Sequence, residues 1–267
     1  MHSVVIQNTN INVSRVSFGT ASLHHLINST RRKTLLETAL SLGVTHFDTS
    51  PYYGYGLSEL ELGLLLKGRR GDLTISTKVG LYPPNRASQG TLNIWTRKIL
   101  GKFNHKLSKP EVDWSLKRAT ISINASLKRL DTSYVDFLFL HEPDILMIDT
   151  EEFAYWIEAL KKQGKIRYGG LAGLPNLLDP WIVNHHPLIE VLQTRDGIND
   201  RDKVDCFSRL GYAPQFTYGY LSEISESKPL KSARKVMNNA LLRNDSGSVI
   251  ISTRKVDRLK ELISVAR

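Results

Sequence analysis

The chain has 267 residues, of which 41% are hydrophobic, so it is long enough to bury a full core. Its 36 lysines and arginines outnumber its 26 acidic residues, for a formal net charge of +10, yet the basic residues are scattered and no nucleic-acid-binding motif accompanies them. A solvated basic surface is therefore favoured over nucleic-acid binding, and without a run of about 18 apolar residues no membrane span is expected.

The first residues and the single cysteine bear on the compartment. Residues 1–6 lack the basic segment and apolar stretch of a signal peptide and are predicted to form a strand. Cys206 has no partner for an intramolecular disulfide, which suits a reducing environment. We therefore expect a cytoplasmic protein, and the sequence leaves its oligomeric state open.

Eight short segments rich in apolar or β-branched residues are predicted to be strands. They are Val16–Gly19, His46–Asp48, Thr74–Lys78, Val135–His141, Ile166–Leu171, Ile189–Gln193, Ala213–Thr217 and Val249–Ser252. Helical spacing of apolar residues occurs at Thr34–Leu42, Ser58–Leu66, Asp113–Leu130, Glu151–Gln163 and Lys255–Val265. Ser58 and Glu61 have the spacing of a capping box at a helix start.

This alternation predicts the α/β class and a single (β/α)₈ TIM barrel domain over residues 1–267. A β-hairpin of Val4–Ile6 and Ile11–Val13 is expected to close the bottom of the barrel. The alternative is a doubly wound open sheet. That fold normally has a glycine-rich phosphate turn after its first strand, whereas residues 19–24 do not match G-x-G-x-x-G.

Residues 80–110 stand outside the alternation. They contain Pro83-Pro84 and several glycines and asparagines, with a short apolar patch only at Ile94-Trp95. A connection of this length in a compact domain is usually functional. Because it follows the third strand, we predict a lid over a substrate site, with a short helix near Thr96–Phe103.

Polar side chains end successive predicted strands. Asp48, Lys78 and His141 end strands two, three and four, and Tyr53 follows Asp48 by five residues in a Pro-Tyr-Tyr-Gly turn. The active site of a barrel forms where the C-terminal ends of its strands meet. Taken singly, each residue also has an ordinary structural interpretation, so it is the set of four that indicates catalysis.

The four side chains have complementary chemistry. A free tyrosine has a pKa near 10, and the ammonium of Lys78 is expected to lower the pKa of Tyr53. Asp48 can hold Lys78 in place, and His141 can donate a hydrogen bond to a carbonyl oxygen. Such a set is a proton source for carbonyl reduction with a nicotinamide cofactor. His46 is expected to be structural, and no metal site is predicted because the histidine pairs lack partners at ligand spacing.

The segment from Gly43 to Leu60 resembles the signature of the aldo-keto reductases, as do Thr77-Lys78, His141 and residues 156–167. The resemblance extends over nearly the whole chain. It implies a (β/α)₈ barrel with Asp48, Tyr53, Lys78 and His141 as the catalytic set and Tyr53 as general acid or base. It also implies hydride transfer between NAD(P)H and an aldehyde, ketone or sugar. Some relatives are cofactor-sensing regulatory subunits, and this non-catalytic alternative is disfavoured by the intact set of four.

The resemblance also assigns cofactor contacts. Around the nicotinamide it implies Gly19, Thr20, Asp48, Gln193 and Phe216, with Tyr218 as the alternative to Phe216, whose other interpretation is barrel packing. Around the adenosine phosphate it implies Ser252, Thr253, Arg254, Arg258 and Glu261. NADP(H) is favoured over NAD(H) because Arg258 matches a 2′-phosphate contact, although Ser252 stands where many NADP-selective members have a lysine.

Two further departures concern the pocket. Ala172-Gly173 replace a Ser-Asn pair that holds the nicotinamide carboxamide in the family, so this binding is expected to rest more on Gln193, with Asn176 in reach. The sequence ends at Arg267 without the tail that walls the pocket of larger members. Specificity is therefore expected to rest on residues 80–110 and 219–231, and basic and aromatic lid residues such as Tyr82 and Arg97 suit a sugar or an anionic carbonyl compound.

Overall fold

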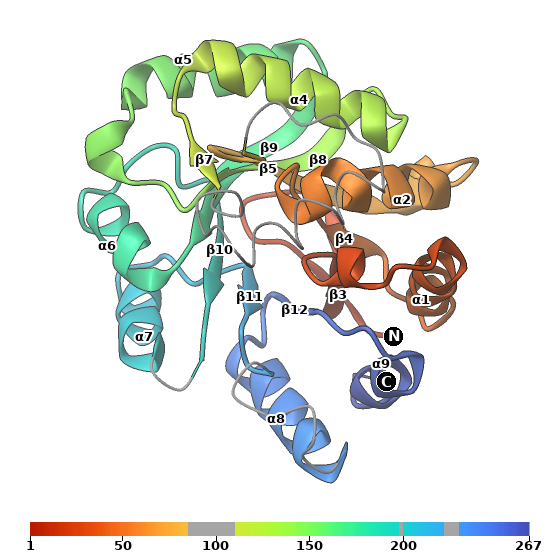
Figure 1. The fold of residues 1–267 in the computed structure, drawn as a ribbon. Coiled ribbons are helices and arrows are strands. Elements are labelled where there is room, and N and C mark those ends of the chain that lie inside the picture. Colours follow the sequence, from red (N-terminus) through yellow and green to blue (C-terminus); the bar gives the residue numbers. More distant parts are fainter. Residues whose placement is uncertain (85–109, 198–199, 222–229, 267) are drawn as a thin grey trace, which may run out of the picture.

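A computed structural model describes residues 1–84, 110–197, 200–221 and 230–266 of the chain (Figure 1). Eight parallel strands close into a barrel in the order β10-β11-β12-β3-β4-β5-β8-β9. The strands are β3 (Val16–Gly19), β4 (His46–Asp48), β5 (Thr74–Val79), β8 (Val135–His141), β9 (Ile166–Gly173), β10 (Val191–Arg195), β11 (Phe216–Tyr218) and β12 (Ser248–Ile251). The predicted (β/α)₈ barrel is confirmed, and the open-sheet alternative is wrong.

Helices surround the barrel on its outer side (Figure 1). They are α1 (Ser29–Ser41), α2 (Leu57–Leu66), α4 (Leu116–Leu130), α5 (Thr150–Lys162), α6 (Pro175–Val183), α7 (Arg201–Arg209), α8 (Leu230–Arg243) and α9 (Val256–Ser264). Three of them, α6 to α8, have no counterpart among the predicted helices. Helix α1 begins five residues earlier than predicted because the Asn28 side chain caps it, accepting hydrogen bonds from the backbone of Thr30 and Arg31.

The predicted capping box at Ser58 and Glu61 is wrong. Gly56 occupies the N-cap of α2 and offers no side chain. The Ser58 hydroxyl instead donates to the carbonyl of Thr20 at 3.1 Å. Glu61 forms a buried ion pair with Arg32 on α1 at 2.6 Å. Both side chains therefore fix α2 to neighbouring segments rather than cap it.

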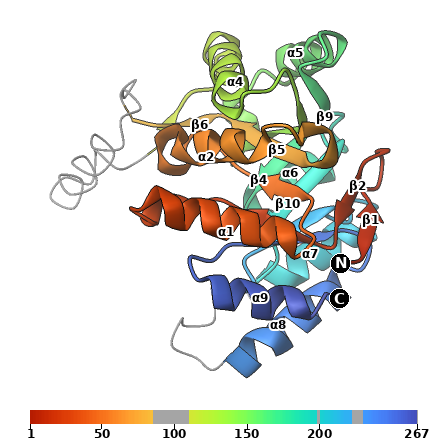
Figure 2. The same cartoon turned by 90° about the vertical axis from the view of Figure 1, so that its right-hand side faces the viewer.

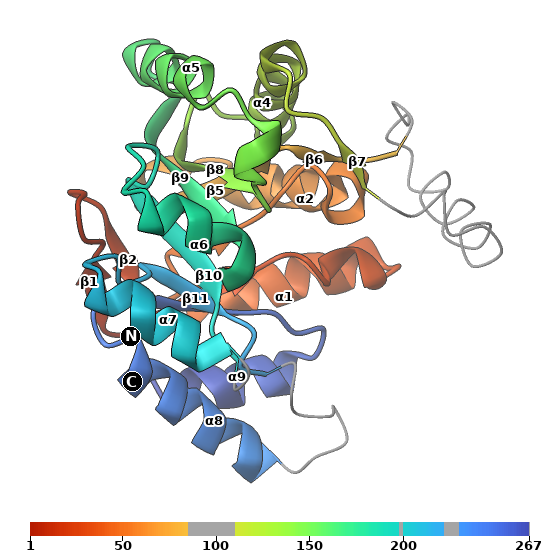
Figure 3. The same cartoon turned by 90° about the vertical axis from the view of Figure 1, so that its left-hand side faces the viewer.

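The N-terminal hairpin closes one end of the barrel, as predicted. Strands β1 (Ser3–Val5) and β2 (Asn12–Ser14) pair antiparallel, and Figures 2 and 3 show them together at one end of the molecule. Ile6, Ile11 and Val13 are almost fully buried and pack in the same cluster as Phe137 from the barrel interior. The hairpin therefore forms the floor of the barrel.

Alternate residues along each strand face the inside of the barrel. On β8, Phe137 and Phe139 pack inside, whereas Leu138 and Leu140 join the outer core beneath the helices. His141 follows Phe139 by two residues and so faces inward at the end of the strand. This period of two directs the strand-end side chains of the predicted site into the barrel opening.

The predicted lid lies mostly outside the described residues, including the helix expected near Thr96–Phe103. Strands β6 (Leu81–Tyr82) and β7 (Glu111–Val112) pair antiparallel, so the two ends of the 80–110 connection lie together. Tyr82 is 1% exposed, and the Arg118 guanidinium lies 4.8 Å from its ring centroid. Tyr82 therefore packs in the core, which corrects its assignment to the lid surface. None of the described helices is long and apolar enough to span a bilayer.

Candidate active site

A cavity of about 650 Å³ opens among the C-terminal ends of the barrel strands. Asp48, Tyr53, Lys78 and His141 all line it, although they come from three strands and one turn. The structure thus brings the four predicted residues together. Within the described residues, no three histidine, cysteine or acidic side chains are grouped so that they could hold a metal ion.

Asp48 and Lys78 form a buried ion pair at the base of the cavity. Lys78 Nζ lies 2.7 and 2.8 Å from the two carboxylate oxygens of Asp48, and it also donates to the carbonyl of Thr49 at 2.9 Å. The Ser76 hydroxyl donates to Asp48 at 2.7 Å. Both charged residues are at most 3% exposed. Burial lowers the pKa of Lys78, and Asp48 opposes this effect.

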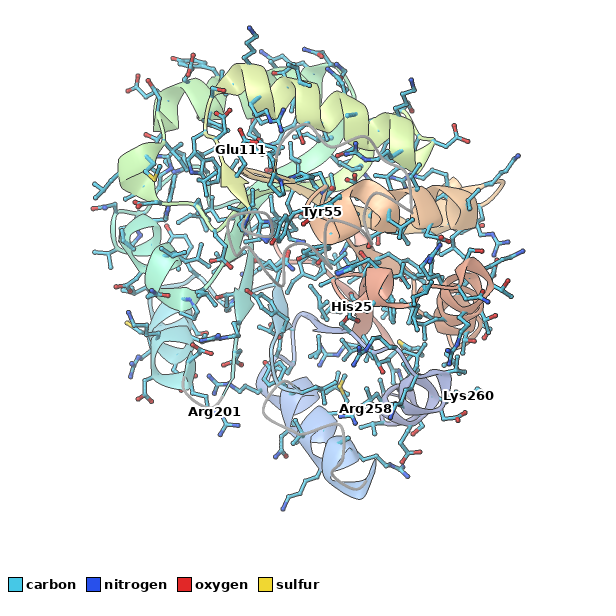
Figure 4. The ribbon with its side chains drawn as sticks, viewed as in Figure 1. His25, Tyr55, Glu111, Arg201, Arg258 and Lys260 are labelled. Atoms are coloured by element: carbon cyan, nitrogen blue, oxygen red, sulfur yellow. The ribbon has the colours of Figure 1, made fainter. Side chains whose placement is uncertain are left out.

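A strained turn after β4 places Tyr53 over the barrel opening. The three residues that follow Tyr53 all have positive φ, namely Gly54 at 60°, Tyr55 at 56° and Gly56 at 89°. A β-carbon on Gly54 would lie only 2.4 Å from the β-carbon of His24, so only glycine fits there. A positive φ is costly for the bulky Tyr55, which Figure 4 labels near α2.

Tyr53 stays protonated at neutral pH in this environment. Its ring centroid lies 5.0 Å from Lys78 Nζ and 6.0 Å from the His141 ring, which it meets edge-on at 89°. Burial, helped by the negative charge of Asp48, raises the pKa of Tyr53 well above 10.0. This is opposite to the lowering expected from Lys78, because burial of the phenol dominates and the charge of Asp48 acts in the same direction. The phenol is therefore a hydrogen-bond and proton donor.

Two inward side chains offer buried polar atoms to the cavity. Burial, aided by Lys78, lowers the pKa of His141 well below 6.5, so its imidazole is neutral. Within the described residues, His141 Nδ1 and Gln193 Oε1 are buried without a hydrogen-bond partner. Buried polar atoms are normally satisfied, so these two atoms offer hydrogen-bonding positions to a molecule bound in the cavity.

The predicted cofactor residues divide into two groups. Gly19, Asp48, Gln193, Ser252, Thr253 and Arg258 line the cavity. Figure 4 labels Arg258 on α9. Thr20, Phe216, Arg254 and Glu261 are not part of the cavity lining. Thr20 is fully buried behind the wall and donates to the carbonyl of Asp48 at 3.0 Å, and Glu261 pairs with Arg234 of α8 at 3.4 Å.

Phe216 packs inside the barrel instead of lining the cavity, which corrects the prediction. It is fully buried, with its ring 4.7 Å from that of His46 at 27° and 5.3 Å from that of Phe137 at 75°. Strand β11 extends to Tyr218, two residues further toward the opening. Tyr218 lies on the same side of the strand and lines the cavity, as the alternative assignment required.

Sequence reasoning missed further cavity residues. Glu142 directly follows His141 and lines the cavity, as does Tyr220, which belongs to the predicted specificity segment 219–231 but was not singled out. The Tyr220 hydroxyl donates to buried Asp196 at 2.6 Å. The available signal was position alone, because residues just after a barrel strand face the active-site end.

The family model for the aldo/keto reductase family matches residues 15–177. L-galactose dehydrogenase from Arabidopsis thaliana is 31% identical over 210 residues, covering 74% of this chain and 58% of the relative. Pyridoxal 4-dehydrogenase from Microbacterium luteolum is 29% identical over 241 residues, covering 85% of this chain and 65% of the relative. The chain thus matches less than two thirds of the length of either relative. The holo form of aldo-keto reductase AKR11C1 from Bacillus halodurans has the same fold, with a TM-score of 0.78 at 20% identity over 99% of this chain and 90% of that one.

Proposed function

The chain belongs to the aldo/keto reductase family, and we propose from this premise that it transfers a hydride between NADP(H) and a small aldehyde, ketone or sugar. The observation that carries the proposal is the convergence of Asp48, Tyr53, Lys78 and His141 in one cavity, with a tyrosine that stays protonated at neutral pH. The named relatives, a sugar dehydrogenase and a pyridoxal dehydrogenase, support an oxidoreductase acting on small molecules.

The residues present suit a nicotinamide dinucleotide. Gln193 Oε1 is a buried acceptor without a partner in the described part of the chain, and an amide N–H would satisfy it. At the other side of the cavity, Thr253 and Arg258 lie at the start of α9, where free backbone N–H groups and the helix dipole favour a phosphate. Arg258 is a cation that lines this side of the cavity, and it supports NADP(H) over NAD(H). Ser252 adds no charge because its side chain is neutral, and its hydroxyl hydrogen-bonds to that of Ser22 at 2.7 Å.

The cofactor supplies or accepts the hydride, and the protein supplies or accepts the proton. In the reductive direction, Tyr53 donates its phenolic proton to the carbonyl oxygen as negative charge develops there, and in oxidation it takes the proton back. His141, neutral and inward-facing, donates a hydrogen bond that orients the same oxygen. Lys78 stabilises the phenolate that forms when Tyr53 gives up its proton, and Asp48 keeps the Lys78 ammonium in place.

A panel of aldehydes, ketones and sugars with NADPH or NADP⁺, followed by absorbance of the reduced nicotinamide, tests the proposal. Tyr53→Phe should lower kcat by about 10²- to 10⁴-fold without changing dinucleotide affinity. Tyr155→Phe on α5, whose side chain is 79% exposed, is the matched control and should behave like wild type. A wild-type protein that binds the dinucleotide but turns over no carbonyl would contradict the proposal and favour a cofactor-sensing subunit.

Selectivity between the two dinucleotides has its own test. Arg258→Ala should raise the Kd for NADPH about tenfold while changing the Kd for NADH little, because the 2′-phosphate would lose a charge-assisted contact. Lys260→Ala is the control, since Lys260 is exposed on the same helix and does not line the cavity. Equal effects on both dinucleotides would remove Arg258 as the basis of selectivity.

A further inference from the structure

Strand β9 ends in two residues without polar side chains. Ala172 lies in register with His141 on one neighbouring strand and with Gln193 on the other. Gly173 follows it and is the last residue of the strand. The centre of the cavity wall at this point therefore offers no side-chain hydrogen bond, and any polar contact must come from the strands on either side.

Two hydrogen-bond acceptors flank this gap. On one side is Gln193, whose Oε1 is buried and lacks a partner among the described residues. On the other is Glu142, which lines the cavity next to His141. Lys78 and Tyr53 are near enough for the charge of Glu142 to shift the pKa of each. Both acceptors are therefore at the reacting end of the cavity.

The Glu142 side chain is held in place by the backbone around Gly173. Glu142 has a φ of 53°, and its N–H donates to the carbonyl of Ala172 at 2.7 Å. Its Oε2 accepts the N–H of Leu174 at 3.0 Å. A β-carbon on Gly173 would lie 3.2 Å from this oxygen and 3.3 Å from the Glu142 α-carbon, tighter than most such contacts. The glycine therefore makes room for the carboxylate.

One oxygen of the carboxylate remains for a ligand. With Oε2 bonded to Leu174, Oε1 has no hydrogen bond to any described residue. A carboxylate oxygen accepts short, strong hydrogen bonds from N–H groups. A nicotinamide dinucleotide has two NH2 groups, one on the carboxamide and one on the adenine, and the carboxamide is attached to the reacting ring. Its two N–H hydrogens can be bound by two separate acceptors.

We propose that Glu142 and Gln193 bind the carboxamide of the nicotinamide, each accepting one of its N–H hydrogens, in place of the side chains that Ala172 and Gly173 lack. This inference rests on the proposed function. It makes Glu142 a cofactor-positioning residue that fixes which face of the ring meets the substrate.

A dinucleotide in which an acetyl group replaces the carboxamide provides the probe, since it has no N–H to donate. Its affinity and that of NADPH are measured by quenching of tryptophan fluorescence in wild type, Glu142→Ala and Glu142→Gln. Wild type should bind NADPH about 10- to 100-fold more tightly than the acetyl analogue in its reduced form. Glu142→Ala should reduce this preference at least fivefold by weakening NADPH binding while leaving the affinity for the analogue nearly unchanged.

Controls separate this effect from a loss of structure. Glu142→Gln keeps an oxygen that can accept from Leu174, so it should keep the fold and lose part of the preference. Asp144→Asn is the matched control two residues away, where the carboxylate only accepts the N–H of Leu146 at 3.0 Å, and it should keep the wild-type preference. Thermal melting of each variant checks folding independently of ligand.

The outcomes distinguish the inference from the proposed function. An unchanged preference in both Glu142 variants would overturn the inference while leaving the oxidoreductase proposal standing. The inference would also be overturned if the variants changed only the ratio between KM for hydroxylated carbonyl compounds and KM for their deoxygenated counterparts, because Glu142 would then bind substrate. A wild-type protein that bound neither dinucleotide would overturn the proposed function itself.

Discussion

Replacing Asp48 by Asn should destabilise the fold strongly, because it leaves the Lys78 ammonium without its counter-ion. The ammonium contacts both carboxylate oxygens within 2.8 Å, and Lys78 is 2% exposed. Removing one member of a buried ion pair costs about 3–5 kcal/mol, since the remaining charge stays out of water. For a chain of this size that loss corresponds to roughly 6–20 °C in Tm.

The loss should depend on pH in a defined direction. Burial already lowers the pKa of Lys78 below 10.5, and Asp48 raises it. Without Asp48 the folded-state pKa falls further, so between that value and 10.5 the unfolded chain binds a proton that the folded chain does not. Stability of Asp48→Asn should therefore rise relative to wild type as the pH increases from 7 to 9.

Urea unfolding followed by circular dichroism at both pH values measures the effect. Glu37→Gln is the control, since Glu37 pairs with Arg69 at 3.1 Å with both side chains 38% exposed, and it should cost less than about 1 kcal/mol. The double variant Asp48→Asn/Lys78→Met should recover most of the loss. An Asp48→Asn variant no less stable than the control would refute the reasoning.

Three other predictions concern packing, backbone and protonation. Phe216→Ala should lower the free energy of unfolding in urea by about 3–5 kcal/mol, whereas Tyr218→Ala should chiefly weaken NADPH binding. The reverse pattern would show that Phe216, and not Tyr218, contacts the cofactor. Gly54→Ala should be less stable than Gly68→Ala, because both have positive φ but only Gly54 faces a clash, and equal melting temperatures would contradict this. Burial lowers the pKa of His46 to about 3 from 6.5, so stability should fall by about 2 kcal/mol between pH 6.5 and 5. A His46→Asn variant with the same pH dependence would disprove that origin.

The barrel and its four central side chains could be predicted because they depend on local patterns. Short apolar strands, helical spacing between them and polar residues at the strand ends are all visible in sequence. The period of two within each strand then directs Asp48, Lys78 and His141 into one opening. Predicting the position of Tyr53 required only that the turn after β4 folds back over the opening, and glycines at 54 and 56 permit that turn.

The errors arose where tertiary contacts outweighed local patterns. Ser58 and Glu61 have the spacing of a capping box, but a nearby carbonyl and a buried Arg32 offered better partners. The expected lowering of the Tyr53 pKa considered Lys78 alone, whereas burial of the phenol and the charge of Asp48 both raise it. Phe216 was placed in the cavity because β11 was predicted to end one residue early, and its last residue is Tyr218.

Helix α6 was missed for a related reason. Helix α6 contains Pro180 and begins with Pro175, so its propensity is weak, and it is held by buried Leu178, Trp181 and Ile182. Glu142 was missed because a glutamate after a strand has no motif of its own. Only the fold shows that Gly173 leaves space for its carboxylate.

The most direct test of the central claim is a fluorescence titration of the purified wild-type protein and Tyr53→Phe with NADPH and then NADH. The cavity with Gln193 at one side and Arg258 at the other predicts saturable quenching by both dinucleotides, tighter for NADPH, with the same affinities in the two proteins. Failure of the wild type to bind either dinucleotide would contradict the account.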